Sequence, residues 1–458
     1  MTDMNMDLKG QKTLVVGLGR TGEAVCSFLA DRGALVTVSE KRPASQLGDQ
    51  ITSLEAKGVR VEAGSHGRET FLNADLIVTS PGVPPLALFS EAESRGVPVI
   101  SEIELAYHFL KGTIVGITGS NGKSTTTTLI HTLLADAGVP SHLAGNIGTP
   151  LITYVQNSTE EDIFVTELSS FQLEHIRSFK ADTAVFLNIS PDHLDWHRSM
   201  DSYIAAKTRL ISGMDQSGTV VLNRDDPQVW KRRTETAAQL LPFSRSKEPD
   251  SVCYIEDGWI VLAAETPARL MPLEDIPLLG PHNQENVMAA ALAAGRFGLE
   301  PEEMAATVRR FRGLEHRLEK AAEIGGVFFY NDSKATNVDS TLRAIDSFNS
   351  PILLILGGRD KDGDFTKLRG AVKTKVKAVF LIGEAKEKIA GALDGYAPLF
   401  TVNDLGEAVR QGYEKAQPGE IVLLAPACTS WDMYRSFEER GRHFKREAAA
   451  LKKTRDGQ

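Results

Sequence analysis

The sequence has few cysteines and no long apolar segment, and both absences narrow the class of protein. Only three cysteines occur in 458 residues, none of them in a CxxC pair. This excludes a disulfide framework and a cysteine-rich zinc site, and it favours a reducing compartment. No apolar run approaches the roughly 18–20 residues of a membrane helix, and the first residues lack the apolar region of a secretory signal. We therefore expect a soluble, cytoplasmic protein.

The chain also lacks an excess of positive charge. Its formal net charge is −9, so its overall field does not favour nucleic acid or an anionic membrane as a partner. Anionic small molecules would instead need a local pocket of cations or backbone N–H groups. At 458 residues, of which 42% are hydrophobic, the chain is long enough for two to four domains of roughly 100–200 residues each.

Short apolar runs alternate with helical stretches through three segments of the chain. Buried strands are predicted at 13–16, 76–80, 113–117, 163–166, 184–189, 327–330, 352–356, 379–382 and 421–424. Such alternation predicts mostly parallel, doubly wound sheets. The predicted fold is therefore α/β with three domains, 1–101, 102–313 and 314–458, and a helix over 103–110 is expected to link the first two.

A glycine-rich turn at 116–125 lies between a predicted strand and a helix that starts at Lys123. Its backbone N–H groups can approach phosphate oxygens, Lys123 supplies positive charge, and the Ser124 hydroxyl can bind Mg²⁺. The spacing departs from the strict phosphate-loop pattern, which would place glycine where Ile117 stands. An ordinary glycine-rich turn is the alternative, but Gly-Lys-Ser in this context favours nucleotide binding. The predicted ATP-binding residues here are Gly116, Gly119, Ser120, Asn121, Gly122, Lys123, Ser124 and Thr125.

A second glycine-rich turn, Gly-Leu-Gly-Arg-Thr-Gly at 17–22, follows the first strand, and Glu40 ends the next strand. This spacing matches a dinucleotide-binding turn and by itself predicts NAD, with Glu40 on a ribose hydroxyl. Any tight strand–helix turn favours the same glycines, however. Lys41 and Arg42 beside Glu40 would equally receive a diphosphate or uridine group, so NAD and a nucleotide-sugar both stay open at this point.

Several acidic and histidine residues follow later strands. Glu167 comes after the strand at 163–166, where a carboxylate can reach Mg²⁺ held at the phosphate loop; a solvated strand end is the alternative. His193 and His197 are four residues apart, but no cysteine or HExxH context supports zinc. We prefer His193 at a second divalent ion, with Asp192 and Asp195 as orienting or capping groups, over a structural histidine.

Together these blocks resemble the Mur ligases of peptidoglycan synthesis. The resemblance covers essentially the whole chain and rests on TGSNGKST at 118–125, ELSSFQLE at 167–174, NISPDHLD at 188–195 and Lys207. In the last third, YNDSKATN at 330–337, GGRDK at 357–361 and APACTSWDMYRSFEERG at 425–441 are similar to the branch of the family that adds D-glutamate. Lys41-Arg42 and Trp196-His197 depart from the pattern expected of the family.

The resemblance implies a ligase that couples D-glutamate to UDP-N-acetylmuramoyl-L-alanine. ATP would phosphorylate the alanine carboxylate, and the amine would then attack the acyl phosphate and release inorganic phosphate. Such chemistry depends on positioning and cations more than on a protein nucleophile. By spacing alone Lys207 is an ordinary surface lysine. It matches the lysine that family members carry as a CO₂-derived carbamate, which requires a depressed pKa that the sequence does not show.

The resemblance also assigns individual residues. It implies Lys123, Glu167, His193 and Lys207 as catalytic residues, and two Mg²⁺ ions held by Ser124, Glu167, His193 and the Lys207 carbamate. Further ATP contacts are implied for Asn283, Asn286, Arg317 and Asp332. The UDP-substrate contacts implied are Thr21, Lys41, Arg42, Ser80, Gly82 and Asn146, which turns the first glycine-rich turn from an NAD site into a UDP site. The D-glutamate contacts implied are Thr336, Lys361, Ser430 and Phe437, with Lys361 neutralising a carboxylate and Ser430 donating to one.

Three alternatives remain at this point. The nearest is another Mur or folylpolyglutamate-type ligase with a different acceptor amino acid. The others are an NAD-dependent oxidoreductase built on the first glycine-rich turn, and a non-catalytic nucleotide switch or motor built on the second. We expect a monomer whose domains close around the substrates. The basic segment 440–453 is most simply a solvated helix face.

Overall fold

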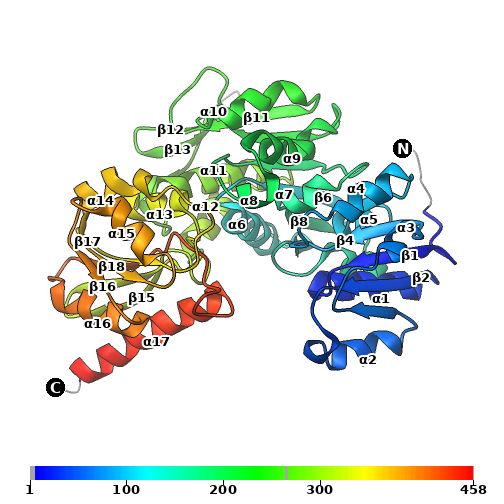
Figure 1. The fold of residues 1–458 in the computed structure, drawn as a ribbon. Helices are drawn as coiled ribbons and strands as arrows, with labels where there is room; N and C mark the ends of the chain where they lie inside the picture. The colour runs from blue at the N-terminus through cyan, green and yellow to red at the C-terminus, as the bar shows by residue number, and fades with distance from the viewer. Residues whose placement is uncertain (1–5, 264–266, 457–458) are drawn as a thin grey trace. The chain divides into compact units, whose positions relative to one another are not determined.

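The computed structural model describes residues 6–263 and 267–456 (Figure 1). The chain forms two compact units. The first comprises Met1–Ile189, Trp196–Pro272 and Glu285–Val308, and the second comprises Ser190–Asp195, Leu273–Gln284 and Arg309–Gln458. Two β-sheets lie in the first unit and one lies in the second. Within the described residues no helix is both long and apolar enough to cross a membrane.

The first sheet has five parallel strands in the order β3-β2-β1-β4-β5. Its elements are β1 Lys12–Val16, α1 Arg20–Asp31, β2 Leu35–Glu40, α2 Asp49–Glu55, β3 Arg60–Ala63, α3 Arg68–Leu72, β4 Leu76–Thr79, α4 Ala87–Ser94 and β5 Val99–Ser101. Successive strand residues point to opposite faces. Val15 therefore packs with Leu29 of α1 on one face, and Leu14 packs with Phe71 of α3 on the other. The predicted doubly wound sheet is confirmed.

The second sheet has nine strands in the order β14-β13-β12-β11-β10-β9-β6-β8-β7. Its strands are β6 Thr113–Thr118, β7 Ser141–Gly145, β8 Ile163–Glu167, β9 Thr183–Phe186, β10 Thr219–Asn223, β11 Gln239–Ser244, β12 Cys253–Glu256, β13 Trp259–Leu262 and β14 Ala268–Pro272. The helices nearby in the chain are α5 Glu102–Tyr107, α6 Lys123–Asp136, α7 Ser170–Glu174, α8 Leu194–His197, α9 Met200–Ser212, α10 Pro227–Lys231, α11 Pro281–Gly295 and α12 Pro301–Arg310. The strands from β7 to β12 pair in parallel, whereas β12, β13 and β14 form an antiparallel meander.

Two features of this sheet differ from the sequence prediction. The predicted strand 184–189 ends at Phe186, because the backbone beyond it turns to bond the phosphate loop. The meander was not predicted at all. Its first hairpin carries a recognisable signal, since Asp257 and Gly258 between β12 and β13 both adopt positive φ, as a two-residue hairpin turn requires.

The helix that links the first two sheets is anchored by buried glutamates. Helix α5 is shorter than the predicted 103–110. Glu104 accepts N–H bonds from Arg177, Ser178 and Phe179 at 2.8–2.9 Å. Glu102 accepts one from Ile152 at 2.7 Å. These bonds fix α5, which follows β5 directly, to segments near the second sheet. The predicted domain boundaries at 101 and 313 remain predictions.

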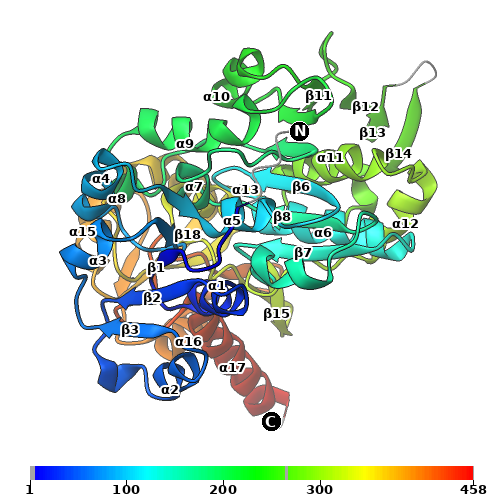
Figure 2. The same ribbon diagram turned by 90° about the vertical axis from the view of Figure 1, so that its right-hand side faces the viewer.

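The third sheet has six strands in the order β15-β16-β20-β17-β18-β19, and only β15 runs antiparallel. Its elements are β15 Glu319–Ile324, β16 Val327–Asn331, α13 Val338–Asp346, β17 Ile352–Gly357, α14 Arg369–Lys375, β18 Val376–Ile382, α15 Lys386–Leu393, β19 Leu399–Thr401, α16 Leu405–Lys415, β20 Ile421–Leu424 and α17 Phe437–Asp456. Leu354 packs toward Ile345 of α13, and Ile355 packs toward Val409 of α16. This sheet is therefore also covered on both faces, by α13, α14 and α15 on one side and by α16 and α17 on the other (Figure 1). Figure 2 shows α17 in red, running to the C-terminus.

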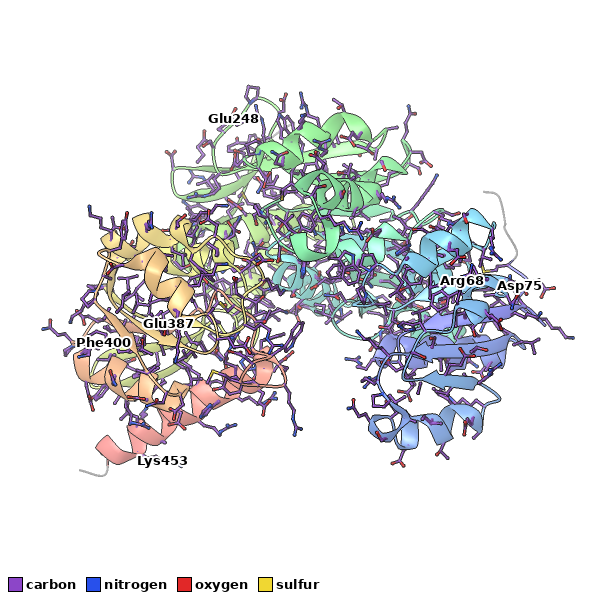
Figure 3. All side chains as sticks on the ribbon, viewed as in Figure 1. Arg68, Asp75, Glu248, Glu387, Phe400 and Lys453 are labelled. Carbon is purple, nitrogen blue, oxygen red and sulfur yellow. The ribbon has the colours of Figure 1, made fainter. Side chains whose placement is uncertain are left out.

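The C-terminal helix α17 corrects one expectation. The basic segment 440–453 is not simply a solvated face, because Arg440 is 1% exposed and Phe444 and Ala448 belong to the core of the second unit. Only its outer side is solvated, where Lys453 points away from the ribbon (Figure 3). Helical periodicity alone does not identify the buried face of a helix this rich in charge.

Candidate active site

The phosphate loop joins β6 to α6 and requires glycine at two positions. Gly119 and Gly122 have φ values of 153° and 86°, which L side chains rarely adopt. At Gly122 a Cβ atom would lie 2.4 Å from Oδ1 of Asn286 on α11, so the approach of that helix also requires glycine. Gly116 lies inside β6 rather than in the loop. A Cβ there would lie 3.0 Å from Leu168, which gives this glycine a packing reason instead.

The loop is held in place by Asn188, which follows β9. The backbone carbonyl of Asn188 accepts from Ser120 N at 2.9 Å. Its side-chain oxygen accepts from Asn121 N at 2.8 Å, and its Nδ2 donates to the Asn121 carbonyl at 3.0 Å. The sequence predictions gave Asn188 no role. Its place at the end of a strand adjacent to β6 is the signal that would have found it.

Two lysine ammonium groups meet at one carbonyl oxygen of the loop. Lys123 Nζ donates to Gly119 O at 2.8 Å and to Ser120 O at 2.9 Å. Lys207 Nζ, from α9, donates to the same Gly119 oxygen at 2.8 Å. Lys207 is 1% exposed, so it is not the surface lysine that its helical setting suggests. Two lysine side chains therefore lie beside the loop, and Lys123 supplies positive charge that suits a polyanionic ligand.

Tyr203 supports this arrangement and was missed by the sequence predictions. The ammonium of Lys207 lies 4.7 Å from the centroid of the Tyr203 ring, within cation–π range. The Tyr203 hydroxyl shares a 2.9 Å hydrogen bond with Ser120 Oγ. Tyr203 and Lys207 are four residues apart on α9, so helical spacing was the available signal.

Glu167 ends β8, the strand next to β6. It pairs in register with Ile117, and it is 2% exposed, so it is not a solvated strand-end residue. Its Oε1 accepts from Nδ2 of Asn146 at 2.8 Å, which brings a predicted substrate residue to a predicted metal ligand. Arg20, in the first glycine-rich turn, donates to the carbonyl of Gly148 at 2.6 Å, two residues beyond Asn146.

The first glycine-rich turn is held in place by hydrogen bonds to the carboxylate of Glu40, at the end of β2. Glu40 Oε2 accepts from Leu18 N at 2.7 Å, and Oε1 accepts from Arg42 N at 2.9 Å and Nε at 3.2 Å. Arg42 Nη2 in turn donates to Leu18 O at 2.7 Å. Burial acts to raise the pKa of Glu40, but these hydrogen bonds and the Arg42 charge hold it below its usual range. Glu40 is thus occupied by the turn, which counts against the NAD interpretation with Glu40 on a ribose.

The predicted UDP contacts of this domain lie at one edge of the first sheet. Thr21 is in the first turn of α1 after β1, exposed Lys41 and Arg42 follow β2, and Ser80 and Gly82 follow β4. These three strands are neighbours and parallel, so their carboxyl ends share an edge. Ser80 Oγ also donates to the Gly17 carbonyl at 3.1 Å, which joins this edge to the turn.

The remaining predicted ATP contacts lie in both units. Asn286 accepts from Thr126 Oγ1 of α6 at 3.2 Å in the first unit. Asn283, one turn earlier on α11, groups with the second unit and donates to Leu279 O at 2.7 Å. Arg317 and Asp332 belong to the second unit. Burial raises the pKa of Asp332 to about 6, although the positive charge of Arg317 acts to lower it.

His193 groups with the second unit, in the segment Ser190–Asp195. Its φ is 53°, and its backbone N donates to Asp192 Oδ1 at 3.0 Å. Asp192 Oδ2 accepts from Nδ2 of Asn337 at 3.0 Å and lies 3.6 Å from His193 Nε2. Asp192 therefore orients His193 beside α13, where Asn337 is the N-cap residue.

Zinc shared by His193 and His197 is not supported. His197 belongs to the first unit, and its Nε2 shares a 2.9 Å hydrogen bond with Ser170 Oγ. Its ring also stacks on Phe171 with the two planes 6° apart. The predicted orienting role of Asp195 depends on a side chain that lies outside the described part of the structure.

The four predicted amino-acid contacts come from four segments of the second unit. Thr336 lies between β16 and α13, Lys361 follows β17, Ser430 follows β20, and Phe437 begins α17. The strands β16, β20 and β17 are neighbours in the sheet. Backbone bonds join the loops: Ala427 N donates to Ala335 O at 2.9 Å, and Arg359 and Thr429 exchange two bonds of 3.0 Å. The structure thus gathers these segments at one sheet edge.

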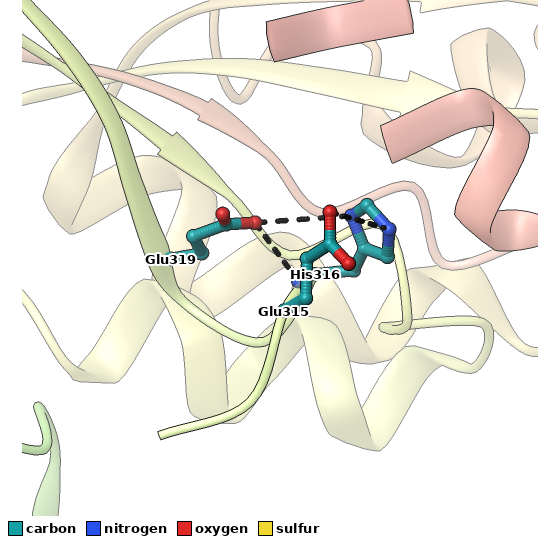
Figure 4. Close-up of side chains that lie close together, drawn as sticks. All are labelled: Glu315, His316 and Glu319. Carbon is teal, nitrogen blue, oxygen red and sulfur yellow. Dashed lines mark hydrogen bonds and ion pairs between the residues drawn. The ribbon is translucent and has the colours of Figure 1, made fainter. Parts of the chain in front are cut away.

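One further polar cluster, which the sequence predictions did not identify, involves Glu315, His316 and Glu319 (Figure 4). Among the described side chains it is the one group of three or more acidic, histidine or cysteine residues close enough to share a metal ion. However, Lys445 Nζ donates to Glu315 Oε1 at 2.6 Å and to Glu319 Oε1 at 2.8 Å, so an ammonium already takes the place of a cation. His316 Nδ1 bonds Asn331 Nδ2 at 2.9 Å. We assign the cluster to anchoring α17.

Three α/β sheets and a glycine-rich loop with a lysine at the start of its helix are typical of a nucleotide-binding protein. Three family descriptions match the chain: "Mur ligase MurD-like, N-terminal domain" over residues 11–101, "Mur ligase middle domain" over 117–294, and "Mur ligase, glutamate ligase domain" over 316–428. The chain belongs to the Mur ligase family.

Individual relatives agree with this assignment. A protein of Acidobacterium capsulatum named UDP-N-acetylmuramoylalanine–D-glutamate ligase is 47% identical over 96% of both chains. One of the same name from Koribacter versatilis is 42% identical over 96% of this chain and 97% of its own. A solved structure of MurF ligase from Thermotoga maritima in complex with ADP covers 97% of this chain and 96% of its own, with a TM-score of 0.59 and 15% identity, and shows the shared fold.

Proposed function

We propose that this chain is an ATP-dependent ligase that joins D-glutamate to UDP-N-acetylmuramoyl-L-alanine, as a monomer in the cytoplasm, during peptidoglycan precursor synthesis. The reaction and its acceptor are supported by the names of relatives that are 47% and 42% identical over 96% of the chain. The observation that carries the ATP-dependent step is the meeting of Lys123 and Lys207 at the Gly119 carbonyl, beside the loop where β6 becomes α6.

ATP binding would use the helix N-terminus and Lys123. The backbone at Gly119 and Gly122 can approach phosphate oxygens, and the dipole of α6 favours negative charge there. On binding, Lys123 would exchange its Gly119 and Ser120 carbonyl partners for the terminal phosphates. This would bring the transferred phosphoryl group to the loop, where the acceptor carboxylate of the nucleotide substrate would also have to bind.

The residues around the loop fit Mg²⁺. This ion prefers oxygen ligands, and the chain supplies the Glu167 carboxylate and the Ser124 hydroxyl, both 2% exposed, from the end of β8 and the first turn of α6. When bound, Mg²⁺ would reduce the repulsion between the two anionic substrates. The metal role of His193, which groups with the second unit, stays a prediction.

Lys207 fits the carbamate role. Its side chain is 1% exposed, and its Nζ lies at the phosphate loop on the Gly119 carbonyl that Lys123 also contacts. The Lys207 ammonium would first lose one proton to give the neutral amine. The amine would then attack the carbon of CO₂, form an N–C bond and lose a second proton, so the side-chain charge would change from +1 to −1. The product would place a carboxylate beside the phosphate loop, where it can support a second Mg²⁺ ion.

The second unit would hold the attacking amino acid. The amine of D-glutamate attacks the acyl carbon of the acyl phosphate, the C–O bond to phosphate breaks, and the amine proton leaves as the amide forms. Lys361 would neutralise one carboxylate and Ser430 would donate to one, with Thr336 and Phe437 completing the pocket. The UDP part would bind at Thr21, Lys41, Arg42, Ser80 and Gly82, with Asn146 near the alanine-bearing arm.

The test is phosphate release with ATP, UDP-N-acetylmuramoyl-L-alanine and one amino acid at a time. We expect D-glutamate to support turnover, and L-glutamate, L-lysine and meso-diaminopimelate to fail. Coupling of L-lysine or diaminopimelate without D-glutamate activity would assign a different acceptor. ATP hydrolysis that no amino acid stimulates would favour a nucleotide switch, and hydride transfer from bound NADH would revive the oxidoreductase.

The matched variant for this test is Lys361→Ala. It should raise the KM for D-glutamate far more than the KM for ATP, because it removes a charge from the acceptor pocket and leaves the phosphate loop intact. An equal rise in both constants would place Lys361 outside the acceptor pocket.

A further inference from the structure

The second unit contains a buried cation to which the proposed reaction assigns no role. Arg440 lies in the first turn of α17 and is 1% exposed. Its Nε donates to Ser333 Oγ at 3.0 Å, and its Nη2 donates to Ser333 O at 2.9 Å and Cys428 O at 3.1 Å. Its Nη1 donates to Thr429 O at 3.1 Å. Burial lowers the pKa of Arg440 to about 10, so the side chain stays charged near neutral pH.

The partners of this guanidinium are carbonyl and hydroxyl oxygens, not carboxylates. Across residues 6–263 and 267–456 no ion pair of Arg440 within 4.0 Å is found, and every bond above goes to a neutral acceptor. A buried charge is costly unless its donors are satisfied. An apolar side chain could fill the same space, but it could not hold three backbone carbonyls at fixed separations. The arrangement therefore serves to hold chain segments together.

The segments that Arg440 holds are those that carry the amino-acid contacts. Ser333 lies three residues before Thr336, and Cys428 and Thr429 directly precede Ser430. Ser333 Oγ, which accepts from Arg440, also donates to the carbonyl of Phe437 at 2.8 Å. The segments of three of the four contacts, those of Thr336, Ser430 and Phe437, are thus joined at this side chain.

The fourth segment is reached through a shared carbonyl. Thr429 O accepts both from Arg440 Nη1 and from Arg359 N, which lies two residues before Lys361. Gly358 packs against the same group: with φ of 133°, a Cβ there would lie 2.2 Å from Thr429 O and 3.1 Å from Arg440 Nη1. The Gly358 backbone therefore lies close to Thr429 O and to the guanidinium, an approach that a side chain at this position would prevent.

We propose that Arg440 is a positioning residue for the amino-acid pocket, holding the four segments with Thr336, Lys361, Ser430 and Phe437 in register for one dicarboxylic amino acid. The inference rests on the proposed ligase function and adds a residue that does not itself touch the substrate. The planar fork of arginine makes several bonds in fixed directions, which a lysine ammonium on a flexible stem cannot reproduce.

The test compares Arg440→Lys and Ser333→Ala with the unaltered enzyme in the phosphate-release assay. Arg440→Lys should raise the KM for D-glutamate about tenfold or more, because several charge-assisted hydrogen bonds are lost. The KM for ATP should change by less than about twofold, and kcat at saturating D-glutamate should be largely kept. Ser333→Ala removes one shared hydroxyl and should raise the same KM about threefold.

Phe444→Leu is the matched control. Phe444 is buried on the same helix one turn later, and its aromatic contact is with Phe329 in the core behind the sheet. This variant should lower the thermal unfolding temperature and leave all three KM values unchanged. This control therefore distinguishes a general loss of stability from a change in the geometry of the amino-acid pocket.

Two results would overturn the inference. One is an unchanged KM for D-glutamate in Arg440→Lys, or in Ser333→Ala should Arg440→Lys fail to fold. The other is an equal rise in the KM values for D-glutamate, ATP and the UDP substrate. The proposed function fails separately, if the unaltered enzyme releases no phosphate with D-glutamate. If another amino acid supports turnover instead, the same variants measured against that amino acid decide the role of Arg440.

Discussion

The first unit contains two glycine-rich turns that each lead from a strand into a helix but lie beside opposite charges. In the turn after β1, the Leu18 N–H donates to the Glu40 carboxylate, which ends the neighbouring strand. In the turn after β6, the Gly119 carbonyl accepts from two ammonium groups, Lys123 and Lys207. Both turns lead from a parallel strand into a helix, and each contains glycine at positive φ.

The difference shows that neighbouring elements, not the turn, set the charge that a ligand meets. At the first turn Glu40 is compensated by Arg42, which also closes back onto Leu18. That turn carries little net charge of its own. At the second turn Lys123 favours a polyphosphate, and Lys207 contacts the same carbonyl. Glycine spacing therefore predicts a turn that can bind a nucleotide, and side chains brought from elsewhere decide which one.

The largest expected effect is at the second turn. Lys207→Ala should lower kcat by about 100-fold or more, because it removes the acid proposed to support Mg²⁺ at the loop. Short carboxylic acids added to the assay should restore part of the rate. Lys41→Ala, the matched change at the first turn, removes an exposed charge and should only raise the KM for the UDP substrate, by less than about tenfold. A fully active Lys207→Ala enzyme would refute the carbamate role.

The next largest effect is expected on stability, from a change in the backbone packing of the first glycine-rich turn. In Gly22→Ala the new Cβ would lie 2.0 Å from the Gly17 carbonyl oxygen, a backbone atom that cannot rotate away. We expect a loss of about 3 kcal/mol in the free energy of unfolding. Gly19→Ala is the control, because a Cβ at that residue would meet no other atom within 4 Å and its φ is −91°. Urea unfolding of both variants measures this difference, and equal stabilities would contradict the close packing.

The third prediction extends the comparison to a buried carboxylate that accepts too few hydrogen bonds to offset its burial. Glu102 is 1% exposed, and burial raises its pKa to about 7 despite N–H bonds from Ile152 and Leu151. An unfolded glutamate loses its proton near pH 4.3. The folded protein therefore binds more protons between about pH 4.3 and 7, and its stability falls as pH rises through that window.

Glu102→Gln removes this titration and should be more stable than the unaltered protein at pH 8, by about 2 kcal/mol, with the difference shrinking toward pH 4. Unfolding curves at both pH values provide the measurement. A constant difference between the two proteins at all pH values would show that Glu102 does not titrate in this range.

The smallest effect is expected at Glu40, with the opposite sign. Its pKa lies below the usual range because its hydrogen bonds outweigh burial. Its contribution to stability is therefore present above about pH 4.3 and is lost as pH falls through the lower folded value. Glu40→Gln should be less stable by about 1 kcal/mol at pH 7 and indistinguishable near pH 3. If Glu40→Gln and Glu102→Gln change the free energy of unfolding in the same direction at pH 7, the difference in hydrogen bonding between these two carboxylates does not determine their contributions to stability.

Much of the fold was predictable because its signals are local. The strands of all three sheets that the sequence predicted are present, and α6 begins at Lys123 with Gly138 in the left-handed conformation just past its end. The meander β12–β14 was missed although Asp257-Gly258 marks its first turn. Its short strands have no helices between them, so the alternation that revealed the other strands was absent.

The site was predictable only in part. Glycine and lysine spacing identified the phosphate loop, but it could not separate Gly116, which packs inside β6, from the loop glycines. Spacing made Lys207 a surface lysine and Arg440 part of a solvated face, yet each is 1% exposed. Which face of a helix is buried depends on what packs against it, and a charged residue carries no local sign of its partner.

By itself the sequence determined the local backbone: where strands alternate with helices, and where glycine is needed for positive φ, as at Gly122. These properties depend on steric contacts between near neighbours in the chain. Only the tertiary structure decided which charges meet. Lys207 is 88 residues from Gly119, and Arg440 is 107 residues from Ser333. Contacts at such separations arise from packing of whole sheets and helices, and short-range sequence patterns do not contain them.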